Sequence, residues 1–163
     1  MAAIRDYLSE DFDRVYEIIN RAAEAYRGVI PADRWHDPYM GGEELQAEID
    51  AGVAFRLWTD EGDVIRGVMG AQPVMDVTLI RHAYVEPGWQ GKGAGSALIE
   101  DLMAGVSGPV LVGSWAAAGW AIRFYRRHGF NLAIEEEKSF LLNKYWNIPE
   151  RQVETSVVLK SEV

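Results

Sequence analysis

The sequence predicts a domain of the α/β class (α+β), with a mixed sheet flanked by helices, from three observations. Apolar residues recur at helical spacing in residues 10–27. Two β-prone runs, residues 53–59 and 64–73, flank the turn signal of residues 60–63 and indicate a hairpin. Short strands then alternate with amphipathic helices to the end of the chain. A length of 163 residues predicts one domain that spans residues 1–163.

The expected elements follow one another without a repeat, a low-complexity tract or a linker. The predicted strands are residues 3–7, 53–59, 64–73, 74–85, 110–113, 130–134 and 153–159. The predicted helices are residues 10–27, 43–51, 93–106, 116–128 and 135–147. We expect Ser9 to cap the first helix, Gly129 to follow the fourth and Pro149 to end the fifth. The predicted order is β-α-α-β-β-β-α-β-α-β-α-β.

Charge and composition exclude several classes of function. The net charge of −9 disfavours nucleic acid and anionic membranes as partners, because both carry negative charge themselves. The same field weakly favours a small cationic acceptor such as an amine. No apolar run approaches the roughly 20 residues that span a bilayer. The absence of cysteine excludes disulfides, thiolate catalysis and cysteine–zinc sites, and no metal is expected. Together with an N-terminus unlike a signal peptide, it predicts a cytoplasmic protein.

A glycine-dense segment joins the strand that ends at Val85 to the following helix. It contains Gln90, Gly91, Lys92, Gly93, Ala94, Gly95 and Ser96. Such a turn at a helix start presents several backbone N–H groups in one direction and suits a pyrophosphate. The P-loop string is missing, and the dinucleotide fingerprint fails because its sixth position is Ser96. The segment therefore predicts a phosphate site of another kind.

Two motifs carry a resemblance to a known family. Gln90, Gly93 and Gly95 fit the pattern [QR]-x-x-G-x-[GA], and residues 121–130 fit A-x-x-F-Y-x-x-x-G-F. In this order and at this separation they resemble the GNAT superfamily of N-acetyltransferases. The resemblance implies acetyl-CoA (coenzyme A) as cofactor, bound by Val85, by the loop from Gln90 to Ser96 and by Tyr125. It also implies a mostly antiparallel sheet that splays open between the fourth and fifth strands.

The same resemblance implies roles in a direct attack of an amine on the thioester, in a ternary complex. The backbone N–H of Val85 is the expected donor to the developing oxyanion, although Val85 also suits a plain core strand. The hydroxyl of Tyr125 is the expected general acid for the leaving thiolate, although Tyr125 also suits simple packing. Both are candidate catalytic residues.

The general base is not specified by the motifs. Family members often place it at positions that correspond to Leu79 or Arg81, and neither side chain acts as a base. His82 is the neighbouring titratable candidate. Strand alternation directs it to the face opposite Arg81 unless a bulge intervenes. A water relay stays open, and the other candidate side chains are His36, Asp37 and Asp76.

For the acceptor the resemblance points to the loop between the first two helices, and aromatic rings with nearby carboxylates suit an amine. The candidate acceptor-binding residues are Trp35, His36, Tyr39 and Trp115. We expect Trp58 and Trp146 to fill the core. The family often has a cofactor-contacting asparagine where this chain has Ala118, which makes that contact doubtful here.

Three questions stay open from the sequence. Residues 143–152 suit either a contact in a homodimer or a wall of the acceptor pocket. The missing side-chain base also fits a non-catalytic acyl-CoA-binding or regulatory module. The sequence also fits an enzyme that acetylates protein N-termini or lysine side chains, and such an enzyme requires an open groove for its protein substrate.

Overall fold

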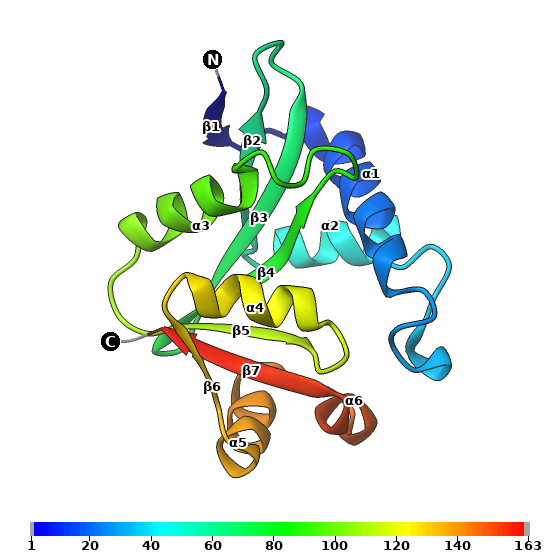
Figure 1. Ribbon diagram of the computed structural model, residues 1–163, viewed down its shortest axis with the longest axis vertical. Helices are drawn as coiled ribbons and strands as arrows, with labels where there is room; N and C mark the ends of the chain where they lie inside the picture. Colours follow the sequence, from blue (N-terminus) through cyan, green and yellow to red (C-terminus); the bar gives the residue numbers. More distant parts are fainter. Residues whose placement is uncertain (1, 162–163) are drawn as a thin grey trace. The chain divides into compact units, whose positions relative to one another are not determined.

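The computed structural model describes residues 2–161 (Figure 1). These residues group into two compact units. The first unit contains residues 2–25, 36–72 and 80–107, and the second contains residues 26–35, 73–79 and 108–161. The strands are β1 (Ala3–Asp6), β2 (Ala54–Thr59), β3 (Ile65–Val74), β4 (Val77–Val85), β5 (Val110–Trp115), β6 (Phe130–Leu132) and β7 (Ser156–Ser161). The helices are α1 (Phe12–Ala23), α2 (Gly42–Asp50), α3 (Ala94–Gly105), α4 (Gly119–Arg127), α5 (Glu135–Tyr145) and α6 (Glu150–Glu154).

The strands of the described residues form a seven-stranded sheet in the order β1-β2-β3-β4-β5-β7-β6. The pairs β1–β2, β2–β3, β5–β7 and β6–β7 are antiparallel, whereas β4 and β5 are parallel. The predicted class, a mixed and mostly antiparallel sheet flanked by helices, is confirmed. The splaying of the sheet and the extent of a single domain stay predictions. Within residues 2–161, no helix combines the length and the apolar character needed to cross a membrane.

In the first unit, helices cover both faces of β2 and β3. Leu57 and Val68 pack with the apolar stripe of α1 and with Leu45 of α2 in one buried cluster. On the other face, a Cβ at Gly67 would lie 3.2 Å from Leu98 of α3, so the missing side chain lets that helix approach the sheet closely. Figure 1 shows α3 on one side of these strands and α1 and α2 on the other.

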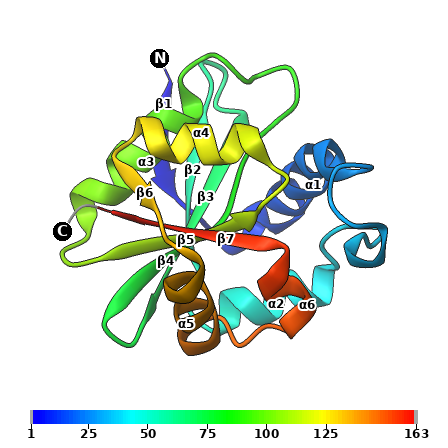
Figure 2. The same ribbon diagram turned by 60° about the horizontal axis from the view of Figure 1, so that its bottom comes forward.

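In the second unit, β5 and β7 lie between α4 and α5 (Figure 2). Leu111 packs with Val77, Leu79 and the α5 side chain of Leu141, and Leu142 and Val153 cover Val158. Trp58 of the first unit is 8% exposed and lies in the core as predicted, whereas Trp146 is half-buried and packs against both clusters of the second unit.

The structure corrects three details of the predicted elements. Ser9 does not cap α1, because it begins a short 3-10 helix, Ser9–Asp11, and Asp11 occupies the cap position. A turn at residues 116–118 precedes α4, which begins at Gly119. Pro149 does not only follow α5: it is the N-cap of α6, so residues 153–154 are helical and the last strand begins at Ser156. Proline suits both places because it has no backbone N–H with which to continue a helix, and because its fixed φ is compatible with a helix start.

Candidate functional site: a glycine-rich loop, a shared carboxylate and a buried tyrosine

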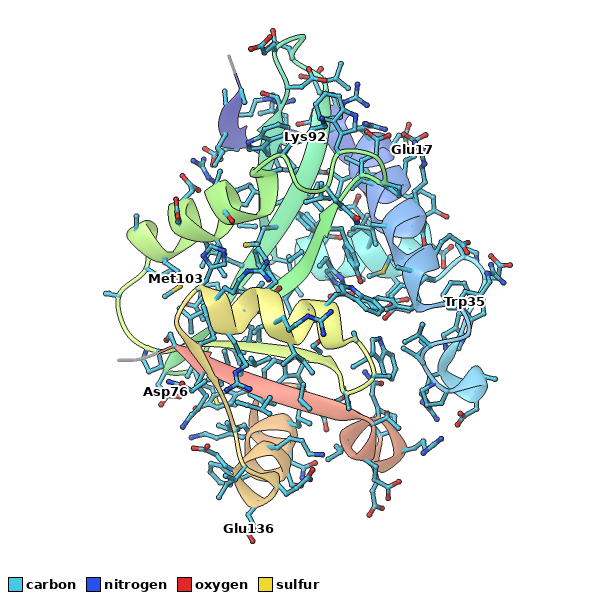
Figure 3. All side chains as sticks on the ribbon, in the orientation of Figure 1. Glu17, Trp35, Asp76, Lys92, Met103 and Glu136 are labelled. Atoms are coloured by element: carbon cyan, nitrogen blue, oxygen red, sulfur yellow. The ribbon has the colours of Figure 1, made fainter. Side chains whose placement is uncertain are left out.

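The glycine-rich loop leaves β4 at Val85 and enters α3 at Ala94. Gly88, Gly91 and Gly93 have φ values of 91°, 79° and 87°, in the left-handed region that other residues adopt only with strain. A Cβ built on any of these glycines meets no atom within 4 Å. The loop therefore exposes its backbone on an open side, and Figure 3 shows Lys92 extending from it.

Electrostatics favour an anion at this loop. It leads directly into α3, whose N-terminal N–H groups and dipole carry partial positive charge. No acidic residue lies in the first turn of that helix, and Lys92 adds a cation from the loop. Gln90, Gly91 and Gly93 are all exposed. The loop thus fits the pyrophosphate that the sequence predicted.

A buried carboxylate fixes the start of the loop. Glu86 is only 4% exposed, and its carboxylate accepts hydrogen bonds from Arg14 at 2.7 Å, Arg21 at 2.7 Å and Arg66 at 2.6 Å. Burial acts to raise the pKa of Glu86, but the hydrogen bonds and charges of Arg66 and Arg14 outweigh it and hold the pKa below its ordinary value. Glu86 therefore ties α1 and β3 to the loop as an anion.

Arg66, one of the three arginines that bind Glu86, also contacts Trp89 of the loop. The Arg66 guanidinium lies 4.4 Å from the centre of the Trp89 ring, a cation–π contact. The Trp89 ring also lies 6.3 Å from that of Trp58. Arg66 additionally donates to Asp60 at 2.9 Å, the residue whose carboxylate closes the β2–β3 turn through Gly62. The loop is thus anchored to the hairpin.

His82 shares a carboxylate with its neighbour Arg81. His82 Nε2 lies 2.8 Å from Glu48 Oε1, and Arg81 Nη2 donates to the same oxygen at 2.6 Å. His82 has φ 57°, a left-handed conformation within β4. This distortion brings consecutive side chains to one partner, so the simple alternation expected for Arg81 and His82 fails here, as it does at a β-bulge. Leu79 is fully buried and packs in the core.

Tyr125 of α4 is buried among aromatic rings. It is 6% exposed, and its ring lies 5.2 Å from Phe124 and 5.7 Å from Phe130. Burial, and then the neighbouring Tyr26, raise the pKa of Tyr125 above its ordinary value. The hydroxyl therefore stays protonated at neutral pH, the form that donates a proton.

The candidate acceptor residues are divided between the two units. Trp35 and Trp115 belong to the second unit, whereas His36 and Tyr39 belong to the first. The Arg27 guanidinium lies 4.5 Å from the Trp35 ring, which Figure 3 shows on the segment between α1 and α2. His36 is exposed and Tyr39 is half-buried. An acceptor-binding role for these residues stays a prediction.

Two more candidate positions have structural partners. Asp76 accepts a hydrogen bond from the Tyr145 hydroxyl at 2.6 Å. This hydrogen bond is the largest of the effects that lower the pKa of Asp76. Residues 143–152 thereby gain an internal role, because the half-buried side chains of Tyr145 and Trp146 pack against the core cluster of the second unit. Ala118, where the family often has asparagine, is fully buried at the N-cap of α4.

Within the first unit, His82 and Val85 lie on β4, and the loop from Gln90 to Ser96 follows this strand and leads into α3. Sequence reasoning missed Glu48 and Glu86. Glu48 lies 34 positions from His82, and Arg14 lies 72 positions from Glu86, so no local pattern announces either contact.

Comparisons with known proteins agree with this geometry. Residues 52–132 match the family model described as "Acetyltransferase (GNAT) domain". A comparison with curated protein sequences found no significant match. The fold is similar to that of the PaiA N-acetyltransferase from Thermoplasma acidophilum in complex with coenzyme A, with TM-score 0.73 and 14% identity over 100% of this chain and 99% of the other.

Two further solved structures are similar. The ribosomal-protein-S18-alanine N-acetyltransferase from Escherichia coli has TM-score 0.68 and 20% identity, over 99% of this chain and 93% of the other. A GNAT family acetyltransferase from Elizabethkingia anophelis with acetyl-CoA bound has TM-score 0.66 and 16% identity, over 99% and 98%. At such identities the likeness concerns the fold. The matched residues 52–132 contain both the glycine-rich loop and the segment around Tyr125, and this part of the chain is a GNAT acetyltransferase domain.

Proposed function

We propose that this chain transfers an acetyl group from acetyl-CoA to a primary amine of a small-molecule acceptor, by direct attack in a ternary complex. The amine nitrogen forms a bond to the acetyl carbon, and the carbon–sulfur bond breaks. The acceptor ammonium loses two protons, one before the attack and one as the amide forms. One proton is delivered to the departing thiolate, and the other is released to water. No covalent enzyme intermediate is required, which agrees with a chain that contains no cysteine.

The observation that carries the proposal is the open glycine-rich loop at the start of α3. Its left-handed glycines leave the backbone accessible, and the helix dipole favours a pyrophosphate there. When bound, acetyl-CoA supplies the activated acetyl thioester. The residues proposed to hold it are the strand end at Val85 and the loop members Gln90, Gly91, Lys92, Gly93, Ala94, Gly95 and Ser96, together with Tyr125.

Three groups of the chain perform the proposed chemistry. The backbone N–H of Val85 donates to the oxygen that gains charge. The Tyr125 hydroxyl, which is protonated at neutral pH, donates its proton to the sulfur. His82, whose side chain is 14% exposed, takes a proton from the acceptor nitrogen. The last assignment replaces the bases that Leu79 and Arg81 do not provide.

The acidic character of the chain supports a cationic acceptor. The net charge is −9, and a negative mean field attracts an ammonium group. The aromatic residues Trp35, Tyr39 and Trp115 suit such a group through cation–π contacts. One protein of similar fold is a ribosomal-protein-S18-alanine N-acetyltransferase. A protein acceptor is therefore the alternative that the test must distinguish from a small-molecule acceptor.

The test is thiol release from acetyl-CoA with a panel of polyamines, amino acids, aminoglycosides and lysine peptides. We expect turnover with at least one small amine, and mass spectrometry should find the product heavier by one acetyl group. Turnover with peptides alone would contradict the small-molecule acceptor. A thermal shift with coenzyme A but no turnover across the panel would show a binding module instead.

Replacement of Gly93 by alanine tests the cofactor loop. The left-handed φ of 87° imposes strain on any side chain there, and the new Cβ extends into the open space proposed for the phosphates. We expect the KM for acetyl-CoA to rise about tenfold, which corresponds to about 1.4 kcal/mol. Gly108→Ala is the matched control, because Gly108 has φ 95° with equally open surroundings but lies outside the loop. A KM equal to that of the control contradicts the assignment.

Replacement of His82 by asparagine tests the proposed base. Loss of a general base typically lowers the rate about 10²-fold or more, so we expect kcat to fall by this factor. The KM for acetyl-CoA should stay unchanged, because His82 is not proposed to hold the cofactor. The measurement is steady-state kinetics between pH 6 and 9 with the best amine of the panel. A kcat equal to the wild-type value leaves proton removal to water and refutes the role of His82.

A further inference from the structure

Glu48 of α2 is the partner of the proposed base. It receives both His82 and Arg81 on a single oxygen, Oε1, at 2.8 Å and 2.6 Å. The Glu48 side chain is 18% exposed and the His82 side chain 14%, so the contact is largely shielded from water. Arg81 is held in turn by Gln72, whose Oε1 accepts from Nη1 at 3.1 Å. The contact therefore belongs to a network from three elements.

The backbone is shaped to make this contact. Without the left-handed conformation of His82, consecutive residues of β4 would point to opposite faces. On the neighbouring strand β3, a Cβ at Gly70 would lie 2.7 Å from the carbonyl oxygen of Arg81 and 2.8 Å from Val53. Only glycine fits at that position without a backbone shift. Strained backbone of this kind persists where the surroundings fix it, often at functional sites.

The charge of Glu48 determines which ring nitrogen of His82 carries hydrogen. Burial acts to raise the pKa of Glu48, but the hydrogen bond from His82 and the charges of His82 and Arg81 outweigh it and lower the pKa. An ionised carboxylate only accepts hydrogen bonds. His82 Nε2 must therefore be the donor, and a neutral ring carries its lone pair on Nδ1.

We propose that Glu48 is the positioning residue of the reaction, holding His82 as the Nε2–H tautomer so that Nδ1 takes the proton of the acceptor. The inference rests on the proposed function. The N–H bond of the acceptor ammonium breaks, and a new N–H bond forms at Nδ1. The imidazolium is then stabilised by the Glu48 carboxylate until Nδ1 returns the proton to water. The charged groups at His82 are Glu48 from α2 and Arg81 from β4, and Phe55 of β2 contributes an aromatic ring 6.3 Å away.

The kinetic test is Glu48→Gln, which keeps the shape of the side chain and removes its charge. We expect kcat to fall at least about 10-fold, the low end of the effect of groups that orient a functional histidine, with the KM for acetyl-CoA unchanged. Glu44→Gln is the matched control, because Glu44 is exposed one turn earlier on the same helix. It should retain the wild-type kcat. An unchanged kcat in folded Glu48→Gln overturns the proposal.

A second measurement needs no variant at Glu48. The chain has three histidines, so ¹⁵N-labelled imidazoles give three resolvable spectra, and His82→Asn identifies the relevant one. In the wild-type protein above pH 8 we expect protonated Nε2 and unprotonated Nδ1. A ring protonated on Nδ1 overturns the proposal, whatever the kinetics show.

The two hypotheses fail in different ways. If His82→Asn loses activity while Glu48→Gln keeps it, the assignment of His82 as general base is supported and the positioning role of Glu48 is wrong. If both variants keep the wild-type kcat while Tyr125→Phe loses activity, acetyl transfer stands and proton removal by His82 fails, and the positioning role fails with it. If no amine of the panel is turned over, the proposed function and this inference both fall.

Discussion

Tyr125→Phe should lower kcat for acetyl transfer by about 10²-fold or more, the usual contribution of a general acid. The substitution removes one oxygen and leaves the ring that packs against Phe124 and Phe130. The fold should therefore survive, and the KM for acetyl-CoA should change far less than kcat. The measurement is thiol release with saturating acetyl-CoA and the best amine of the panel.

The buried position of the hydroxyl gives this expectation a pH signature. Because burial and then Tyr26 raise the pKa of Tyr125, the hydroxyl should remain protonated up to at least pH 10. The wild-type kcat is therefore expected to show no decrease on the alkaline side up to that pH, since Tyr125 does not lose its proton in this range. The acid role and the raised pKa thus predict the same profile.

The control is Tyr7→Phe, which removes the hydroxyl of a half-buried tyrosine directly after β1. Burial, and then Asp11, raise the pKa of Tyr7 too, so the two tyrosines differ in proposed role and not in protonation. We expect Tyr7→Phe to keep the wild-type kcat. If Tyr125→Phe behaves like it, Tyr125 is only a packing residue, the alternative that the sequence left open.

The parts of the molecule that the sequence predicted are contiguous in the chain. The loop from Gln90 to Ser96 and the motif around Tyr125 each occupy one short segment, so spacing alone identified them. The elements were predicted for the same reason, since apolar periodicity and turn residues are local signals. The predicted fold class and cofactor agree with the structure and with the family match.

The parts that the sequence did not predict depend on distant contacts. The left-handed backbone of His82 is fixed by Gly70 of another strand and by Glu48 of a helix. Alternation along β4 directs His82 away from Arg81 unless a bulge intervenes, and the left-handed backbone of His82 is an irregularity of that kind, which a period of two does not predict. Helix α6 was missed because Pro149 serves as a helix stop or as a helix start.

Glu86→Gln is expected to lower the free energy of unfolding by about 3 kcal/mol at pH 7. The substitution leaves Arg14, Arg21 and Arg66 around a neutral amide, with their mutual repulsion uncompensated. Loss of one partner of a buried ion pair costs about 3–5 kcal/mol in general. We take the lower end because these guanidiniums are themselves partly exposed. The measurement is urea unfolding followed by tryptophan fluorescence.

The matched control is Glu17→Gln on α1, which removes another carboxylate partner of Arg14. The Glu17 side chain is 52% exposed, and Figure 3 shows it on α1, so water screens this pair. Exposed ion pairs contribute about 0–1 kcal/mol, and the control should change stability by no more than that. A Glu86→Gln variant as stable as Glu17→Gln would contradict the anchoring role of Glu86.

The pH dependence separates charge from shape at Glu86. Its pKa in the folded chain lies below the ordinary value of 4.5, so the stabilisation is present above that pH and is lost as the pH falls through the folded value. Wild-type stability should therefore decrease below about pH 4.5, and Glu86→Gln should lose less over the same interval, since glutamine has no proton to gain. Parallel curves for the two proteins would show that the arginines do not act on the charge of Glu86. Converging curves would show that this carboxylate, which precedes the cofactor loop, holds α1 and β3 to the loop through its charge.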